Sequence, residues 1–295
     1  MTKRHLPTLR AALQRVRRSL LVRGALSTRL GVLGLILLGL LVVIAVMGPV
    51  VSPHSATAVV GFPFAGPSWN HPFGTDELGR DALARFLAGG GTLLAVTFGS
   101  TLLAYVVALP VGLAAGYRRG LVELATIGSA DFLIAFPPIV LLLLVAAGAG
   151  SGVLFAALAI AAIQIPRIVR LARAATLDAS TKEYVEAAVA RGERVSTLLR
   201  REILPNIWSP ILADFGIRLT SSALLFASVS FLGLGAAPPS ADWGLMISEN
   251  RSALLVQPWV IIPPAAAIAL LTVSVNLTAD AVARSVGRSI VHRGI

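Results

Sequence analysis

Residues 30–53 read LGVLGLILLGLLVVIAVMGPVVSP and contain no charged side chain. Uncharged runs of similar length recur at 86–117, 132–166, 219–241 and 252–279. A helix needs about 20 apolar residues to cross the hydrocarbon core of a bilayer, and each of these runs is longer. The chain of 295 residues is 56% hydrophobic and only 13% charged, whereas a soluble domain carries about 25% charged residues. The sequence therefore predicts an all-α, polytopic membrane protein.

Six transmembrane helices are predicted from these runs. The run at 132–166 is too long for one span, and Gly148, Gly150 and Gly152 mark a turn inside it. The expected spans are 30–51, 92–116, 124–147, 153–172, 211–234 and 259–282. The first span exceeds the apolar region of about 7–15 residues in a cleaved signal peptide, so we expect it to remain as an anchor.

The distribution of basic residues predicts the orientation. With a cytoplasmic N-terminus, the outer segments would be 52–91, 148–152 and 235–258. Of the 25 Lys and Arg residues, these segments hold only Arg80, Arg85 and Arg251. Positively charged segments stay on the cytoplasmic side of a membrane, so both termini are predicted to be cytoplasmic.

The chain accordingly divides into a basic N-terminal arm (1–29), a transmembrane domain (30–284) and a cytoplasmic tail (285–295). The arm has two interpretations. It either only sets the topology, or it lies on the inner leaflet as an amphipathic helix, since Leu9, Leu13, Val16 and Leu20 have helical spacing.

Composition excludes several functional classes. The net charge of +11 does not indicate nucleic-acid binding, because the basic residues flank the apolar runs. The absence of cysteine excludes disulfides and thiol chemistry. The four histidines are scattered and lack the spacing of a metal site; they are His5, His54, His71 and His292. No glycine loop with Lys and Ser or Thr is present, so ATP hydrolysis is not expected in this chain. We expect neither a cofactor nor a metal.

The most informative segment is 180–206, which is predicted to be a cytoplasmic pair of helices. Ser180 and Glu183 have the spacing of a capping box, which predicts that a helix begins there. Gly192 is suited to end that helix in a left-handed turn. A second helix would follow, limited by Pro205. On these grounds alone, an ordered loop without a partner remains an alternative.

This segment resembles the EAA loop of ABC importer permeases. The residues that carry the resemblance are Glu186, Ala187, Ala188, Gly192, Ile203, Leu204 and Pro205. The resemblance implies a type I importer permease fold, in which this loop docks into a separate ATPase subunit and transmits its closure. ATP and Mg²⁺ would then be bound by the partner subunits.

Two outer segments resemble the C-type subunit of the dipeptide/oligopeptide/nickel permeases. The first is FGTDELGRD at 73–81; the second comprises SFLGLG at 230–235 and DWGLMI at 242–247. The resemblance implies docking of an external binding protein at Phe73, Gly74, Thr75, Asp76, Gly79, Arg80, Asp81, Trp243 and Gly244. From the residues alone, the aspartates would equally serve to cap the next helix, and Trp243 would suit the membrane interface.

Ionisable residues inside the predicted spans are candidates for the translocation path. Asp214 and Arg218, four residues apart, are expected to form a neutral structural pair. The orientation of Asp131 is left open: its side chain would face the second permease, the translocation path or the inner lipid headgroups. Relatives commonly carry glutamate at the position of Phe226, so the polarity of the path also stays open. The candidate path residues are Asp131, Phe226, Ser228 and Ser230.

The resemblance implies half of the translocation pathway of an ATP-driven importer in the inner membrane of a prokaryote, with peptides as cargo. Its partners would be a second, B-type permease, two ATPase subunits, an external binding protein and membrane lipid. A nickel chelate or haem is an alternative cargo. A secondary transporter is a further alternative, but it predicts an internal repeat that the sequence does not show. The last alternative is a passive scaffold protein of the membrane.

Overall fold

The computed structural model describes residue 26 and residues 28–291. Its helices are α2 (Arg29–Val51), α3 (Ala82–Arg118), α4 (Leu121–Ile134), α5 (Pro138–Ala149), α6 (Val153–Ser180), α7 (Glu183–Ala190), α8 (Val195–Leu198), α9 (Leu204–Asn206), α10 (Trp208–Phe231), α11 (Trp243–Glu249) and α12 (Ile262–Val291). The amphipathic helix considered for the basic arm lies outside the described residues.

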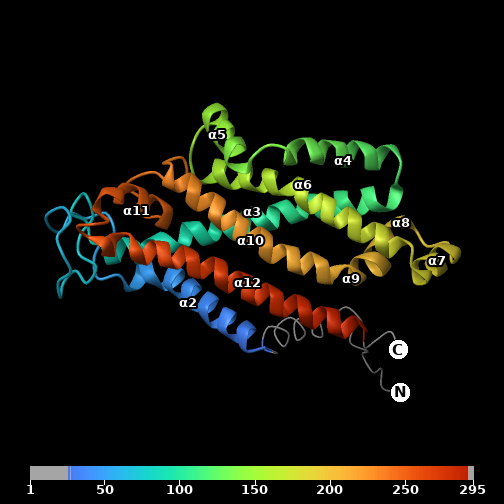
Figure 1. Cartoon of the computed structure of the whole chain (residues 1–295), viewed down its shortest axis with the longest axis horizontal. Helices are drawn as coiled ribbons and strands as arrows, with labels where there is room; N and C mark the ends of the chain where they lie inside the picture. Colours follow the sequence, from blue (N-terminus) through green and yellow to red (C-terminus); the bar gives the residue numbers. More distant parts are fainter. Residues whose placement is uncertain (1–25, 27, 292–295) are drawn as a thin grey trace, which may run out of the picture.

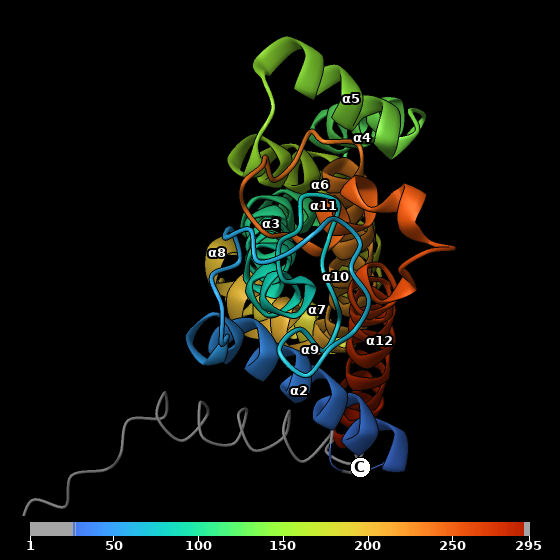
Figure 2. The same ribbon diagram turned by 90° about the vertical axis from the view of Figure 1, so that its left-hand side faces the viewer.

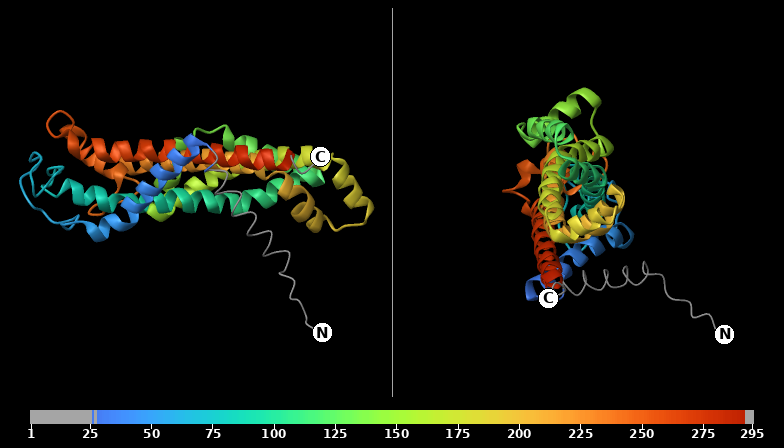
Figure 3. Two further views of the ribbon diagram at one scale, coloured as in Figure 1. Left: turned by 90° about the horizontal axis from the view of Figure 1, so that it is seen from below. Right: turned by 90° about the vertical axis from the view of Figure 1, so that its right-hand side faces the viewer.

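The long helices form an elongated bundle (Figure 1). Helices α3, α6 and α10 lie in its middle, α4 and α5 cover one side, and α2 and α12 cover the other. Seen from below, α2 lies obliquely across the bundle (Figure 3). The loop 52–81 and α11 lie at one end, and α7 and α8 lie at the other. The loop 52–81 and α11 are thereby separated from α7 and α8 by the length of the bundle.

The number of membrane-spanning segments agrees with the prediction, and the third of them differs in form. Among the described residues, five helices are long and apolar enough to span a membrane, and one bent pair brings the number to six. The bent pair replaces the single helix predicted at 124–147, because Glu123–Ile134 and Pro138–Gly148 meet at 88°. Pro137 adopts an extended conformation and Pro138 starts α5. Proline disfavours helical geometry at the residue before it, so the pair ends one helix and begins another.

Three other spans extend past their predicted bounds: α3, α6 and α12, the last of which continues from the expected end at residue 282 to Val291. Helix α3 begins at Ala82, ten residues before the expected span at 92–116. Its N-cap is Asp81, whose Oδ1 accepts hydrogen bonds from the backbone N–H groups of Leu83 (2.9 Å) and Ala84 (3.3 Å). This confirms the predicted capping by aspartate. Helix α6 starts at Val153 as predicted but continues past residue 172 to Ser180.

Small residues bring the central helices together. On α3, Gly112 and Gly116 are separated by one turn, and they face Val169, Ala172, Arg173 and Thr176 of α6. A Cβ at Gly112 would lie within 2.9 Å of the carbonyl oxygen of Val169. Gly-xxx-Gly pairs of this kind allow two membrane helices to approach closely where no water drives their association.

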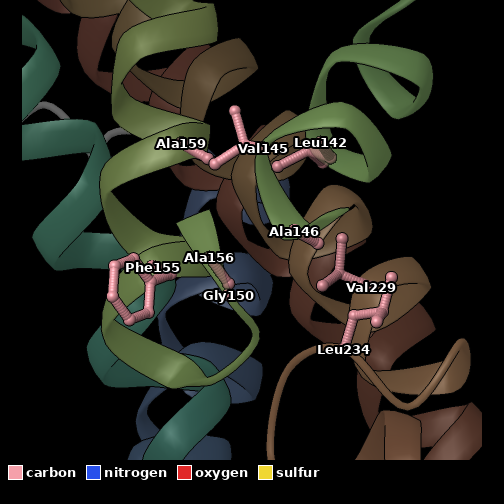
Figure 4. Close-up of a pocket in the computed structure, with 9 residues that line it drawn as sticks. All are labelled: Leu142, Val145, Ala146, Gly150, Phe155, Ala156, Ala159, Val229 and Leu234. Atoms are coloured by element: carbon pink, nitrogen blue, oxygen red, sulfur yellow. The ribbon is translucent and has the colours of Figure 1, made fainter. Parts of the chain in front are cut away.

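Helix α5 packs on the bundle through apolar side chains alone (Figure 4). Leu142, Val145 and Ala146 of α5 face Ala156 and Ala159 of α6 and Val229 of α10. Leu142, Ala156, Ala159 and Val229 are buried in one core cluster with residues of α3 and α12. The short α5 is therefore held by packing rather than by polar contacts.

A polar network crosses the middle of the bundle. Arg218 donates to Asp214 Oδ1 at 3.0 Å, and the hydroxyl of Tyr105 donates to Asp214 Oδ2 at 2.7 Å. The structural pair predicted between Asp214 and Arg218 is thus confirmed. Gln164 Nε2 donates to the carbonyl oxygen of Arg218 (3.0 Å) and to Ser222 Oγ (3.2 Å). The network joins α3, α6 and α10, and a low-dielectric surrounding makes such bonds costly to break.

Replacement of Asp214 with Asn should destabilise the protein strongly. It leaves the largely buried Arg218 guanidinium without its counter-charge, which costs about 3–5 kcal/mol. Thermal unfolding of the detergent-solubilised protein measures the effect. The double variant Asp214→Leu/Arg218→Met should recover part of the loss, because it removes both charges.

Asp131→Asn is the matched control. Asp131 pairs with Arg170 at 3.4 Å, but both side chains are about half exposed, at 53% and 54%. Because both groups lie at the edge of the bundle and not in its buried network, this variant should lose less thermal stability than Asp214→Asn. Equal losses in Asp131→Asn and Asp214→Asn would contradict the assignment of a structural role to the network.

Candidate functional site

The hairpin, defined here as residues 183–206, begins later than predicted. Ser180 is the last residue of α6, and its hydroxyl donates to the carbonyl oxygen of Leu177 at 2.8 Å. It therefore cannot cap a new helix, and the predicted capping box with Glu183 is wrong. Helix α7 begins at Glu183 after the extended Lys182. Glu183 and Glu186 lie in its first turn, where the helix dipole favours negative charge.

Gly192 ends α7 as predicted. It has φ +73°, and its N–H donates to the carbonyl oxygen of Val189 at 2.9 Å. The N–H of Glu193 donates to the carbonyl oxygen of Ala188 at 3.3 Å. These two bonds form a Schellman motif, in which a residue other than Gly or Asn is strained. The glycine is needed for its backbone conformation and not for space, since a Cβ there would meet no atom within 4 Å.

The second half of the hairpin continues through Pro205. After α8, a π-turn spans Leu199–Ile203, with the N–H of Leu204 bonded to the carbonyl oxygen of Leu199. Pro205 lies in the first turn of α9, where a missing N–H costs nothing. The chain then enters α10 at Trp208. The second helical segment of the hairpin therefore ends at Asn206, one residue after the predicted limit at Pro205.

The hairpin residues predicted to couple to an ATPase fall into two groups. Ala188 and Ile203 are fully buried, together with Val185 and Leu198, and they pack in one cluster with Ile168, Ala172 and Ala179 of α6. Glu186, Ala187, Gly192 and Pro205 are exposed, and Leu204 is half-buried. The first group anchors the hairpin to α6, and the second forms its free surface.

Sequence reasoning missed three apolar side chains on this free surface. Tyr184 and Val189 of α7 and Val195 of α8 are exposed at the hairpin end of the bundle. The spacing of three or four residues that buries Val185 and Ala188 leaves Tyr184 and Val189 outside, and that periodicity is the signal that could have identified them.

At the opposite end, the 73–81 segment and α11 are joined by a buried ion cluster. Arg80 lies 2.6 Å from Asp76 (Nε to Oδ2) and 3.0 Å from Glu249 (Nη2 to Oε2). Arg85 lies 3.3 Å from Asp76 (Nε to Oδ2) and 2.7 Å from Glu249 (Nη2 to Oε2). Arg85 is 0% exposed. Charges buried in this way need close partners, and here two cations and two anions alternate.

Further bonds hold the same segment to its surroundings. The N–H of Glu77 donates to Asn250 Oδ1 at 3.0 Å, and the hydroxyl of Thr75 donates to the carbonyl oxygen of Phe62 at 2.6 Å. Burial raises the pKa of Glu77, and the neighbouring carboxylates of Glu249 and Asp76 add to that rise. The loop 52–81 and α11 are seen together at this end in Figure 2.

The predicted docking residues are therefore mostly interior. Gly74, Thr75, Asp76, Gly79, Arg80 and Asp81 are buried, and Phe73 is half-buried. Trp243 is fully buried: its indole N–H donates to the carbonyl oxygen of Phe86 at 2.9 Å, and its ring stacks on that of Phe86. Gly244 packs beneath it against Ala227. Direct contact of Trp243 with a partner or the interface is excluded in this structure.

The exposed side chains at this end are different ones. The large apolar side chains there belong to Val59, Phe62, Trp69, Leu78, Leu254, Leu255 and Val256. Leu78 lies inside the 73–81 segment, whereas the other six lie outside it. Local sequence could not distinguish those six from ordinary loop residues.

Two histidines also meet at this end. His54 Nδ1 lies 2.7 Å from Asp81 Oδ2, and His71 Nδ1 lies 3.1 Å from the same oxygen. The three groups are close enough to share a metal ion. The spacing of the histidines in the sequence did not indicate a metal site, because the contact between them depends on the conformation of the loop.

The candidate path residues do not come together. Phe226 and Ser230 are fully buried in the bundle, so they cannot line an open path in this structure. Ser228 is exposed on another face of α10, and its hydroxyl donates to the carbonyl oxygen of Leu224 at 2.8 Å. Asp131 lies on the outer side of the bundle on α4, paired with Arg170.

Comparison with known proteins places this geometry in a family. Residues 108–292 match the family described as binding-protein-dependent transport system inner membrane component. The chain is 40% identical to the glutathione transport system permease protein GsiD of Pectobacterium atrosepticum, over 73% of this chain and 71% of the relative. It is 36% identical to the protein of the same name from Escherichia coli O1:K1 / APEC, over 82% of this chain and 80% of the relative.

A solved structure shares the fold. In an inward-facing conformation of the MetNI methionine ABC transporter, one chain aligns with a TM-score of 0.55 at 19% identity. The match covers 68% of this chain and 96% of that chain. The chain therefore belongs to the family of binding-protein-dependent inner-membrane transport components, as a permease subunit of an ABC importer.

Proposed function

We propose that this chain forms half of a translocation pathway for short peptides. The cargo class is supported by the relatives, which are named for transport of glutathione, itself a peptide. The observation that carries the proposal is the separation of two ends. One end presents a free hairpin surface suited to an ATPase, and the other presents a rigid loop layer suited to a binding protein.

The proposed orientation has the hairpin and both termini in the cytoplasm. At the loop end, Arg80 and Arg85 are neutralised in the buried ion cluster, which leaves Arg251 exposed among the described residues of that end. The hairpin carries exposed cations at Arg191, Arg194, Arg200 and Arg201. The excess of Lys and Arg at the hairpin end over the loop end supports this orientation.

The hairpin is proposed to dock into an ATPase subunit, which would hold ATP and Mg²⁺. Its free surface combines Glu186, Ala187 and Gly192 with exposed Tyr184 and Val189. Small side chains let a partner approach the backbone closely, and exposed apolar ones provide burial energy. Because Ala188 and Ile203 anchor the hairpin to α6, a push on the hairpin would be transmitted to the bundle.

A second, B-type permease is proposed to face α10. Ile217, Leu224, Ser228 and Phe231 are exposed along α10 at intervals of three to seven residues, which places them on one face. A groove of about 580 Å³ lies along this face, bounded by Ile139 of α5 and by Leu224, Ser228 and Phe231. Ser228 supplies the polar side chain of this groove. Of the candidate path residues, Ser228 is therefore the one that the geometry favours. The groove lining offers no imidazole or carboxylate for a bare nickel ion.

Substitutions in the hairpin test the coupling. In the purified complex with its ATPase subunits and binding protein, Gly192→Pro and Glu186→Arg should each lower binding-protein-stimulated ATPase activity at least about tenfold. Proline cannot adopt the positive φ of Gly192, and arginine reverses a charge on the exposed surface. ATPase rate with and without binding protein is the measurement.

Two matched controls accompany these variants. Gly192→Asn should retain most of the stimulation, because Asn tolerates the left-handed conformation. Asp280→Arg makes the same charge change on an exposed position of α12, outside the hairpin, and should behave like the wild type. Stimulation that survives both Gly192→Pro and Glu186→Arg would show that the hairpin is not the coupling element.

The absence of cysteine makes the α10 face directly testable. Ser228→Cys should react with a hydrophilic maleimide in the assembled complex, whereas the buried Ser230→Cys should react at least about tenfold more slowly. Peptide cargo should protect Ser228→Cys. Equal labelling rates at the two positions, or no protection by any peptide, would remove Ser228 from the path.

A further inference from the structure

Three side chains from separate positions converge at the start of α3. His54 follows α2, His71 lies 17 residues further along the loop, and Asp81 is the N-cap of α3. Their potential ligand atoms all lie within 4.8 Å of one another. Asp81 is 0% exposed, while His54 and His71 are 34% and 20% exposed. The cluster is thus open to solvent on the histidine side and closed on the carboxylate side.

Both imidazoles present the same ring nitrogen to one oxygen atom. Nδ1 of His54 and Nδ1 of His71 approach Asp81 Oδ2 at 2.7 and 3.1 Å. Two nitrogen lone pairs and a carboxylate oxygen repel one another unless protons or a cation lie between them. The convergence therefore requires either two N–H donors or one bound cation.

The surrounding bonds fix the three groups in place. Asp81 Oδ1 is held by the N–H groups of Leu83 and Ala84, which leaves Oδ2 directed at the histidines. The hydroxyl of Ser52 donates to the carbonyl oxygen of His54 at 2.8 Å, and the N–H of His71 donates to Ser68 Oγ at 3.1 Å. Outer bonds of this kind orient the ligands of metal sites.

We propose that His54, His71 and Asp81 form a binding site for Zn²⁺ or a similar transition-metal ion. Two imidazoles and one carboxylate are the ligand set of open zinc sites, whereas Ca²⁺ and Mg²⁺ prefer oxygen alone. A tetrahedral Zn²⁺ with bonds of about 2.0–2.1 Å holds its ligand atoms about 3.3 Å apart. From 2.7 and 3.1 Å, the His54 imidazole needs to withdraw from Asp81 by about 0.6 Å and the His71 imidazole by about 0.2 Å, which side-chain rotation of the partly exposed rings allows.

The ion would fasten the loop 52–81 to the beginning of α3. It would tie two loop positions to the start of α3. Its fourth ligand would be water or a donor from a partner. This role is independent of the cargo and of the hairpin, so it goes beyond the proposed transport function.

Zinc binding to the purified complex tests the proposal. The protein is prepared with a histidine-free affinity tag, stripped with a chelator and titrated with Zn²⁺ against a chromophoric competitor. We expect one Zn²⁺ per chain and a rise in melting temperature. His54→Gln and His71→Gln should each weaken binding at least about tenfold, and the double variant should abolish it. Substituting Co²⁺ should give the visible absorption of a four- or five-coordinate ion.

Two variants separate ligation from folding. Asp81→Asn should lose the ion yet keep the start of α3, because Asn is as good an N-cap as Asp. His5→Gln removes a histidine of the N-terminal arm and should bind like the wild type. Metal-free melting temperatures report whether each variant folds. A wild-type protein that shows neither Zn²⁺ stabilisation nor the Co²⁺ absorption, or a double variant that binds as tightly, would overturn the proposal and leave a hydrogen-bonded cluster.

Discussion

The close approach of α3 and α6 is the contact on which the rest of the structure depends. Gly112 and Gly116 bring the backbones together, and helix association in a membrane has to rely on such packing because lipid offers no hydrophobic driving force. Both helices extend beyond the predicted membrane segments. The loop 52–81 leads into the beginning of α3, and the hairpin follows the end of α6. The contact therefore connects the two ends of the molecule through two continuous helices.

Polar groups reinforce this connection where the membrane makes them costly. Tyr105, Gln164 and Asp214 come from α3, α6 and α10, and each has its partner within the network. The same reasoning applies at the loop end, where burying the charge of Arg85 would be energetically prohibitive without Asp76 and Glu249. In both places, charge is placed where it fixes one arrangement of helices. A bundle held in this way is expected to move as rigid bodies rather than by deformation.

Hydropathy predicted the spans because each needs a long apolar run, and capping by Asp81 followed from its position. The bend at Pro137 and Pro138 was underestimated, because proline is tolerated inside membrane helices and only packing decides whether it kinks or breaks one. The capping box at Ser180 failed for a related reason. Both ends of α6 were judged from local sequence, whereas its packing on α3 through Ala172 and Thr176 extends the helix past the expected boundary.

The sites were predictable as segments but not as surfaces. Resemblance identified the hairpin and the 73–81 segment, yet a motif does not say which of its residues point inward. Arg85 meets Glu249 across 164 positions in sequence, and His54 meets Asp81 across 27. Contacts of this range arise from the tertiary fold. The motif around Asp76 and Arg80 thus specifies a rigid scaffold, and the surface that a partner would touch belongs to less distinctive residues such as Phe62 and Leu78. If a binding protein docks here as the resemblance implies, recognition and rigidity would be carried by different residues of one loop, and the partner could change while the scaffold is kept.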